Sequence, residues 1–194
     1  GQTTTLAGIP VPATNIGALV NYSTPSAGAP IDNFSLNQAG GNVNLSQVKF
    51  TTTGSYTTAD IASFALYVNT VSNSFNGSVA VPTGSVTAGP AGLQTITLST
   101  VYPMIAGFNY WFFIVPVVNT GAVAGNTIAV NGIASTDITV SAGSVSGSTS
   151  ATGTITIINP SITGTTPGSR CGSGTVTLNA TPATGGSVNW YTTS

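Results

Sequence analysis

Short stretches in which apolar and polar residues alternate recur along the chain, and no stretch keeps the longer period of an amphipathic helix. A period of two places successive side chains on opposite faces of a strand, so each stretch predicts a half-buried β-strand. Clusters of Gly, Pro, Asn and Ser bound these stretches at spacings of about ten residues, which is typical of an all-β protein. The strands predicted in this way are 47–50, 64–69, 93–99, 128–130, 138–140, 154–157, 175–179 and 187–191.

The segment 108–117 differs from these strands because it carries an apolar residue at nearly every position. Phe112 and Phe113 fall on opposite faces of a strand, so both faces of this segment need cover. We therefore expect it at the centre of a sheet, with Trp111 packed in the core rather than exposed as a surface for sugars. Pro116 cannot donate a ladder hydrogen bond and is expected to mark a bulge or the end of the strand.

The domain organisation follows from this spacing. The 24 Gly and 11 Pro among the 194 residues suit many short strands joined by turns. Residues 1–160 are predicted to form one β-sandwich, since a segment of this length buries a sizeable core. Residues 161–194 are too few to fold alone and are expected to begin a second β domain that the sequence cuts short. Half of its core would consist of Val176, Leu178, Val188 and Trp190.

The composition departs from that of an ordinary soluble domain, which carries about a quarter charged residues. Here 41% of the residues are hydrophobic and only 3% are charged, namely Lys49, Arg170, Asp32, Asp60 and Asp137. The net charge of −1 provides no field to attract a polyanion, so nucleic acid is not expected as a partner. The longest apolar run, 110–118, contains a proline and is shorter than the roughly twenty residues of a membrane-spanning helix. The scarcity of Lys and Glu favours a secreted chain.

The sequence contains few of the side chains that commonly act in catalysis. Without His, the Ser–His and Cys–His pairings are excluded, and without Glu a glycosidase would need two of the three Asp residues. The chain is therefore not expected to be an enzyme, and no catalytic, cofactor-binding or metal-binding residue is assigned.

Asp60 and Asp137 both precede Ile, and two interpretations of them stay open. They are turn or cap residues, as isolated Asp near strands often are, or they are ligands of one Ca²⁺ built largely from carbonyl groups. Asp60 would also favour the N-terminus of a one-turn helix over 57–62, capped by Thr57 or Thr58.

Cys171 is the single cysteine, so no disulfide can form within the chain. Its thiol is buried and free, reactive, or half of a disulfide whose partner lies beyond Ser194. One cysteine supports no zinc or redox motif.

Three segments near the C-terminus carry a resemblance to a known family: 166–172 (TPGSRCG), 174–178 (GTVTL) and 189–191 (NWY). In this order and spacing they resemble the opening of an immunoglobulin-like domain that is repeated in giant secreted proteins of Bacteroidetes. Weaker similarity to another module of the same proteins covers 51–70, 124–128 and 136–138.

This resemblance implies an immunoglobulin-like fold and a segment of a large adhesin on the bacterial cell surface. It implies export by the type 9 secretion machinery, a link to gliding motility, and a disulfide between Cys171 and a cysteine beyond Ser194. We accordingly expect a non-enzymatic structural or adhesive segment that mediates attachment or forms a stalk. Its partners would be neighbouring domains of the same chain, surface glycans or other copies of itself, with no cofactor.

Two alternatives stay open at this point. A carbohydrate-binding module of a secreted enzyme would expose coplanar aromatic side chains such as Trp111, Tyr56 and Tyr102. A self-assembling filament subunit would accept a strand of another chain beside 175–179.

Overall fold

A computed structural model of the chain describes residues 3–8, 16–17, 30–75, 79–158, 162–166, 168–169 and 171–182. It confirms that the protein is all-β, since the described residues contain one short 3-10 helix, η1 (Ser135–Asp137), beside their strands. The strands are β1 (Thr3–Gly8), β2 (Ile16–Gly17), β3 (Asp32–Ala39), β4 (Val43–Thr53), β5 (Ile61–Asn69), β6 (Val79–Thr87), β7 (Leu93–Met104), β8 (Asn109–Val118), β9 (Thr127–Val130), β10 (Ile138–Val140), β11 (Ser144–Ser148), β12 (Ile155–Ile158), β13 (Ile162–Thr166) and β14 (Asn179–Pro182).

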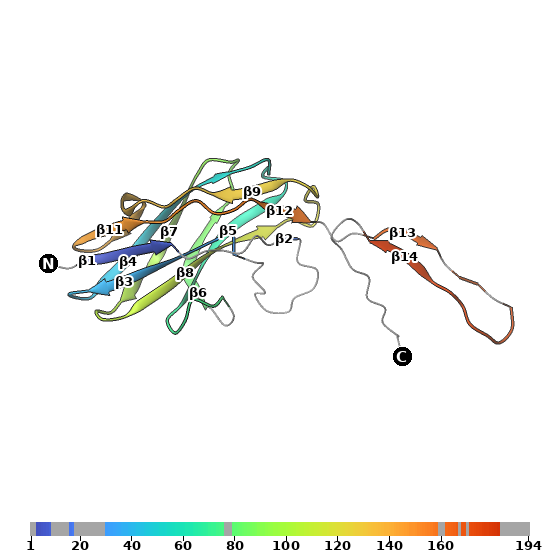
Figure 1. Ribbon diagram of the computed structural model, residues 1–194, viewed down its shortest axis with the longest axis horizontal. Coiled ribbons are helices and arrows are strands. Elements are labelled where there is room, and N and C mark those ends of the chain that lie inside the picture. The colour runs from blue at the N-terminus through green and yellow to red at the C-terminus, as the bar shows by residue number, and fades with distance from the viewer. Residues whose placement is uncertain are drawn as a thin grey trace.

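Two large sheets form a β-sandwich (Figure 1). The first sheet has the order β11-β1-β3-β8-β5-β6, and the second has the order β10-β4-β9-β12-β2 with β7 paired to β4. Most neighbours are antiparallel, but β1 pairs with β11 and β2 pairs with β12 in parallel. The β-sandwich expected for this part of the chain is thus confirmed, whereas an immunoglobulin-like topology stays a prediction.

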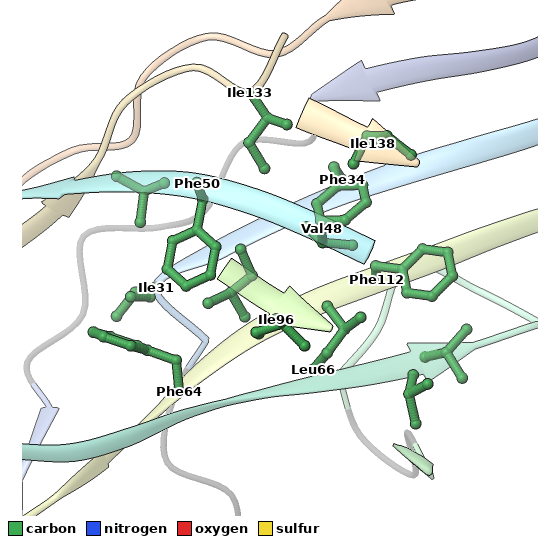
Figure 2. Packing of buried hydrophobic residues seen from close by; sticks show 14 of the residues in the cluster. Ile31, Phe34, Val48, Phe50, Phe64, Leu66, Ile96, Phe112, Ile133 and Ile138 are labelled. Atoms are coloured by element: carbon green, nitrogen blue, oxygen red, sulfur yellow. The ribbon is translucent and has the colours of Figure 1, made fainter. Parts of the chain in front are cut away.

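The core lies between the inner faces of the two sheets (Figure 2). Phe50 of β4 meets Phe64 of β5 edge to face, with ring centroids 5.4 Å apart, and so joins the second sheet to the first. Phe34 and Phe112 stack on neighbouring strands of the first sheet, also at 5.4 Å. Burying each such side chain contributes about 1.5–3 kcal/mol, and these rings belong to one larger cluster of aliphatic and aromatic residues from both sheets.

Strand β8 lies between β3 and β5 in the first sheet and is covered on both faces, as its continuous apolar sequence predicts. Phe112 and Ile114 point into the core, while Phe113 and Val115 are 1% exposed on the opposite face. Pro116 does not end the strand, because β8 continues past it to Val118. The bulge expected at Pro116 is found beside it, in the neighbouring strand β5, where the register shifts between Ile61, opposite Val118, and Ser63, opposite Val117. A bulge there absorbs the irregularity without ending either strand.

Two further expectations are corrected. The segment 57–62 is a turn followed by the start of β5, not a helix, because Ile61 already pairs with Val118 in the first sheet. The predicted strand 175–179 is also wrong, since only Asn179 belongs to a strand and Val176 and Leu178 are 42% and 51% exposed.

The reason for the second correction lies in the pairing of β14. This strand is four residues further along the chain than predicted, where Asn179 to Pro182 pair with β13. Among the described residues no second layer covers Val176 and Leu178, so their alternation has no core to face. The predicted strand 187–191, with Val188 and Trp190, lies outside the described residues, and the domain division at residue 160 stays a prediction.

Candidate functional site

The carboxylate of Asp60 is the most fully bonded acidic group in the described part of the chain. Asp60 ends the turn before β5 and is 0% exposed. One oxygen, Oδ1, accepts the backbone N–H of Val123 at 2.7 Å. The other, Oδ2, accepts the N–H and Oγ1 of Thr57 at 2.7 and 2.9 Å and Nδ2 of Asn126 at 2.9 Å. Burial acts to raise the pKa of Asp60, and the four hydrogen bonds outweigh it and hold the pKa below its ordinary value.

These bonds tie the β4–β5 turn to the loop between β8 and β9. Backbone contacts strengthen the same junction, since Asn119 donates its N–H to the carbonyl of Asp60 at 2.8 Å and its Nδ2 to the carbonyl of Ala59 at 3.0 Å. A carboxylate offers about four acceptor positions, and four donors already occupy those of Asp60. This geometry favours the turn interpretation of Asp60 over a role as a calcium ligand.

Asp137 lies in a different turn and has fewer partners. It closes η1, where its Oδ2 accepts the N–H of Ala134 at 2.9 Å and its own N–H donates to the carbonyl of Ala134 at 2.9 Å. This is the arrangement of a helix cap. The structure therefore places Asp137 and Asp60 in separate turns, and its described residues contain no group of three or more His, Cys, Asp or Glu that could hold a metal ion.

Asp32 is a buried carboxyl whose environment the sequence analysis missed. It is 2% exposed and lies two and four residues before Phe34 and Leu36 along β3, so it shares their face on the core side of the first sheet. Its Oδ1 accepts the N–H of Asn33 at 2.7 Å, and its Oδ2 has no hydrogen-bond partner among the described residues. Burial raises the pKa of Asp32 to about 7, and the bond from Asn33 opposes this rise only in part. The sequence feature that could have indicated this burial is the position of Asp32 at the start of the alternating stretch that contains Phe34 and Leu36.

The aromatic side chains that a sugar-binding surface would need are built into separate packing arrangements. Tyr56 is 3% exposed, and its hydroxyl lies 2.7 Å from Oγ1 of Thr52. Tyr102 packs edge to face on Phe112 with centroids 6.0 Å apart and is half-buried. These positions count against a coplanar exposed platform that includes both tyrosines.

Trp111 belongs to a second cluster on the outer face of the first sheet. This outer cluster consists of Tyr67, Phe113 and Val115, with Ala65, Phe75 and Trp111 packed against it. Phe75 bridges it, because its ring lies 5.3 Å from both Tyr67 and Phe113. The half-buried indole of Trp111 therefore packs against apolar neighbours on the outer face, and not in the core between the sheets where it was expected.

Cys171 lies between β13 and β14, and its side chain is exposed. Exposure excludes the interpretation of Cys171 as a buried free thiol. A disulfide with a cysteine beyond Ser194 stays a prediction.

The first and last strands of the sandwich, β1 and β12, lie where the chain enters and leaves it. β1 lies between β3, which it pairs with through six residue pairs, and β11, which it pairs with through five. Leu6 and Thr4 of β1 are buried, and the hydroxyl of Thr4 donates to Oε1 of the fully buried Gln38. β1 begins at one end of the sandwich, and β12 ends at the other (Figure 1).

The sequence matches no known protein family and no curated protein. No helix within the described ranges is long and apolar enough to cross a membrane.

Proposed function

We propose that the chain is a non-enzymatic segment of a large secreted protein on a bacterial cell surface, where it forms part of a stalk or an attachment structure. The observation that carries this proposal is the placement of the terminal strands of the sandwich, with β1 starting at one end and β12 finishing at the other (Figure 1). Units connected in this way extend end to end, as a stalk requires.

The composition supports the same role. A chain with 3% charged residues, rich in Ser, Thr and Asn, presents a neutral polar surface that does not attract polyanions. The buried carboxylate of Asp60 stabilises a loop junction through four hydrogen bonds, which is structural duty rather than acid–base chemistry.

Export by the type 9 secretion machinery, a role in gliding and contact with glycans or other copies are part of this proposal through the family resemblance. A carbohydrate-binding module is less favoured, because Tyr56 is buried in the core. No described contact favours the filament alternative over a stalk.

The proposal is tested on cells that produce the full-length protein. Proteinase added to intact cells should remove the segment, as detected by an antibody against residues 30–158, while a cytoplasmic marker stays intact. Deletion of residues 1–160 from the gene should reduce attachment of the cells to a surface. Protection of the segment until the cells are lysed, or unchanged attachment after the deletion, would contradict the proposal.

A further inference from the structure

We propose that the sandwich carries tensile force along the chain and that the parallel pair β1–β11 is the element that resists it. This inference rests on the proposed stalk function, because a stalk transmits force from one end of each unit to the other. It adds a mechanical function and assigns it to specific strands.

The direction of the force follows from the topology. β11 is the last strand of the first sheet along the chain, and β12 of the second sheet follows it. Thr3 pairs with Ser144 at the beginning of both strands, whereas Ala7 pairs with Ser148 at their far ends. Because the two strands run parallel, tension on Thr3 and on the chain after Ser148 pulls them in opposite directions along their common axis.

This geometry loads the hydrogen bonds of the pair together. In a sheet the inter-strand bonds run across the strands, so a force along the strands stretches all of them at once. An antiparallel pair would place the two pulled ends side by side, and its bonds would open one after another. The parallel arrangement therefore resists force better than the antiparallel arrangement with the same number of bonds.

The last strand, β12, is held more weakly. It pairs with β9 through two residue pairs and with β2 through two, although Ile155 and Ile157 are buried. If β12 is pulled out first, the tension passes to the segment after Ser148, which Thr149 and Thr152 bond to Ile133 and Val130, and it reaches β1–β11 once these bonds have opened. The pair β1–β11 therefore bears the tension after β12 and this segment have detached.

Side chains of β1 add a second resistance to sliding. Leu6 is 2% exposed within the core, and the hydroxyl of Thr4 donates to Gln38. Gln38 in turn donates from Nε2 to the carbonyl of Gly41 at 2.6 Å. A shift of β1 by one residue would turn Leu6 out of the core and would break the bond between Thr4 and Gln38.

Gly147 permits the close contact between the two strands. It has φ +90°, and a Cβ at this position would lie 2.4 Å from the carbonyl oxygen of Leu6. Gly107 offers a matched control in the β7–β8 turn, since its φ is +87° and a Cβ there meets nothing within 4 Å. Both positions have a similar positive φ that alanine rarely adopts, but only at Gly147 does the added Cβ push β11 away from β1.

The test is single-molecule force spectroscopy on the full chain held by its two ends. Gly147→Ala should unfold about tenfold faster than Gly107→Ala at the same force, which corresponds to about 1.4 kcal/mol of barrier. Equal rates for the two variants would overturn the proposal.

A second comparison stays informative if Gly147→Ala does not fold. With Cys171→Ser as background, handles on Thr3→Cys and Ala39→Cys, which are paired neighbours on β1 and β3, pull β1 sideways from its end. Opening in this direction should need clearly less force than pulling through the chain ends, and equal or greater force would overturn the proposal. Force is measured on purified protein and surface location on cells, so failure of this inference is distinguishable from failure of the stalk proposal.

Discussion

Oδ1 of Asp60 accepts a hydrogen bond from the backbone N–H of Val123, 63 residues further along the chain, at a distance of 2.7 Å. This hydrogen bond and the one that Asn126 donates to Asp60 join the β8–β9 loop to the turn before β5. Because hydrogen bonds to a charged acceptor are stronger than neutral ones, this junction is expected to be a major contributor to the stability of that end of the sandwich.

Asp60→Asn should therefore lower the free energy of unfolding by about 2–3 kcal/mol, since the amide can no longer accept all four donors. Asp137→Asn is the matched control, because the single side-chain bond found for Asp137 is exposed, and it should cost less than about 1 kcal/mol. Urea unfolding followed by tryptophan fluorescence measures both values. Equal losses would show that Asp60 has no special role.

Asp32 makes stability depend on pH. Its pKa is 3.8 when unfolded and about 7 when folded, so the folded state binds more protons between these values. The free energy of unfolding should then fall as the pH rises from about 4 to about 7, by about 4 kcal/mol from this group, and stay level above. Asp32→Asn removes this dependence and should be more stable than the native chain above pH 7, with the difference vanishing below pH 4. Parallel stability curves over this range would contradict the assignment.

Phe113 tests the outer cluster. Phe113→Ala should destabilise the protein by about 3–5 kcal/mol, because the ring is 1% exposed and contacts Phe75. Phe108→Ala is the control, since Phe108 is 56% exposed at the start of the same segment and should change stability by about 0.5 kcal/mol or less. Thermal unfolding curves distinguish the two. Similar effects would mean that the outer face of β8 is not a second core.

Gly54 tests the close backbone contact between the β4–β5 turn and the start of β9. It has φ +119°, and a Cβ would lie 2.2 Å from the carbonyl oxygen of Thr127. Gly54→Ala should cost more than Gly125→Ala, whose φ of +95° is also strained but whose Cβ meets nothing within 4 Å. Chemical denaturation of the two variants gives the comparison, and a larger loss for Gly125→Ala would refute it.

The parts of the fold that the sequence predicts are those with a strong local pattern. The alternation around Val48, Leu66 and Ile96 gave β4, β5 and β7, and the apolar run through Phe112 gave the central strand β8. Strands without such a pattern were missed, and so was β3, although Phe34 and Leu36 alternate with polar residues along it. β1 contains Leu6 as its one large apolar residue, and β11 consists mostly of Ser and Gly. In β6, Pro82 and Gly84 interrupt the alternating pattern of the sequence, although the strand itself is continuous.

The candidate sites were less predictable because they depend on distant contacts. The sequence places Asp60 in a turn, but its bonds to Val123 and Asn126 join loops more than sixty residues apart. The raised pKa of Asp32 follows from its burial in the folded protein, which the local sequence does not show. Conversely, Val176 and Leu178 alternate with polar residues as in a half-buried strand, but both side chains are exposed. A pattern specifies a strand only when a neighbouring strand and a core are present to receive it.

The central claim, that this segment holds cells to a surface by bearing tension, is tested most directly by attachment under flow. Cells carrying Gly147→Ala are predicted to attach normally in still medium and to detach at lower flow than the native strain. Cells carrying Gly107→Ala should detach at the native flow. Identical detachment of all three strains, at equal amounts of surface protein, would contradict the account.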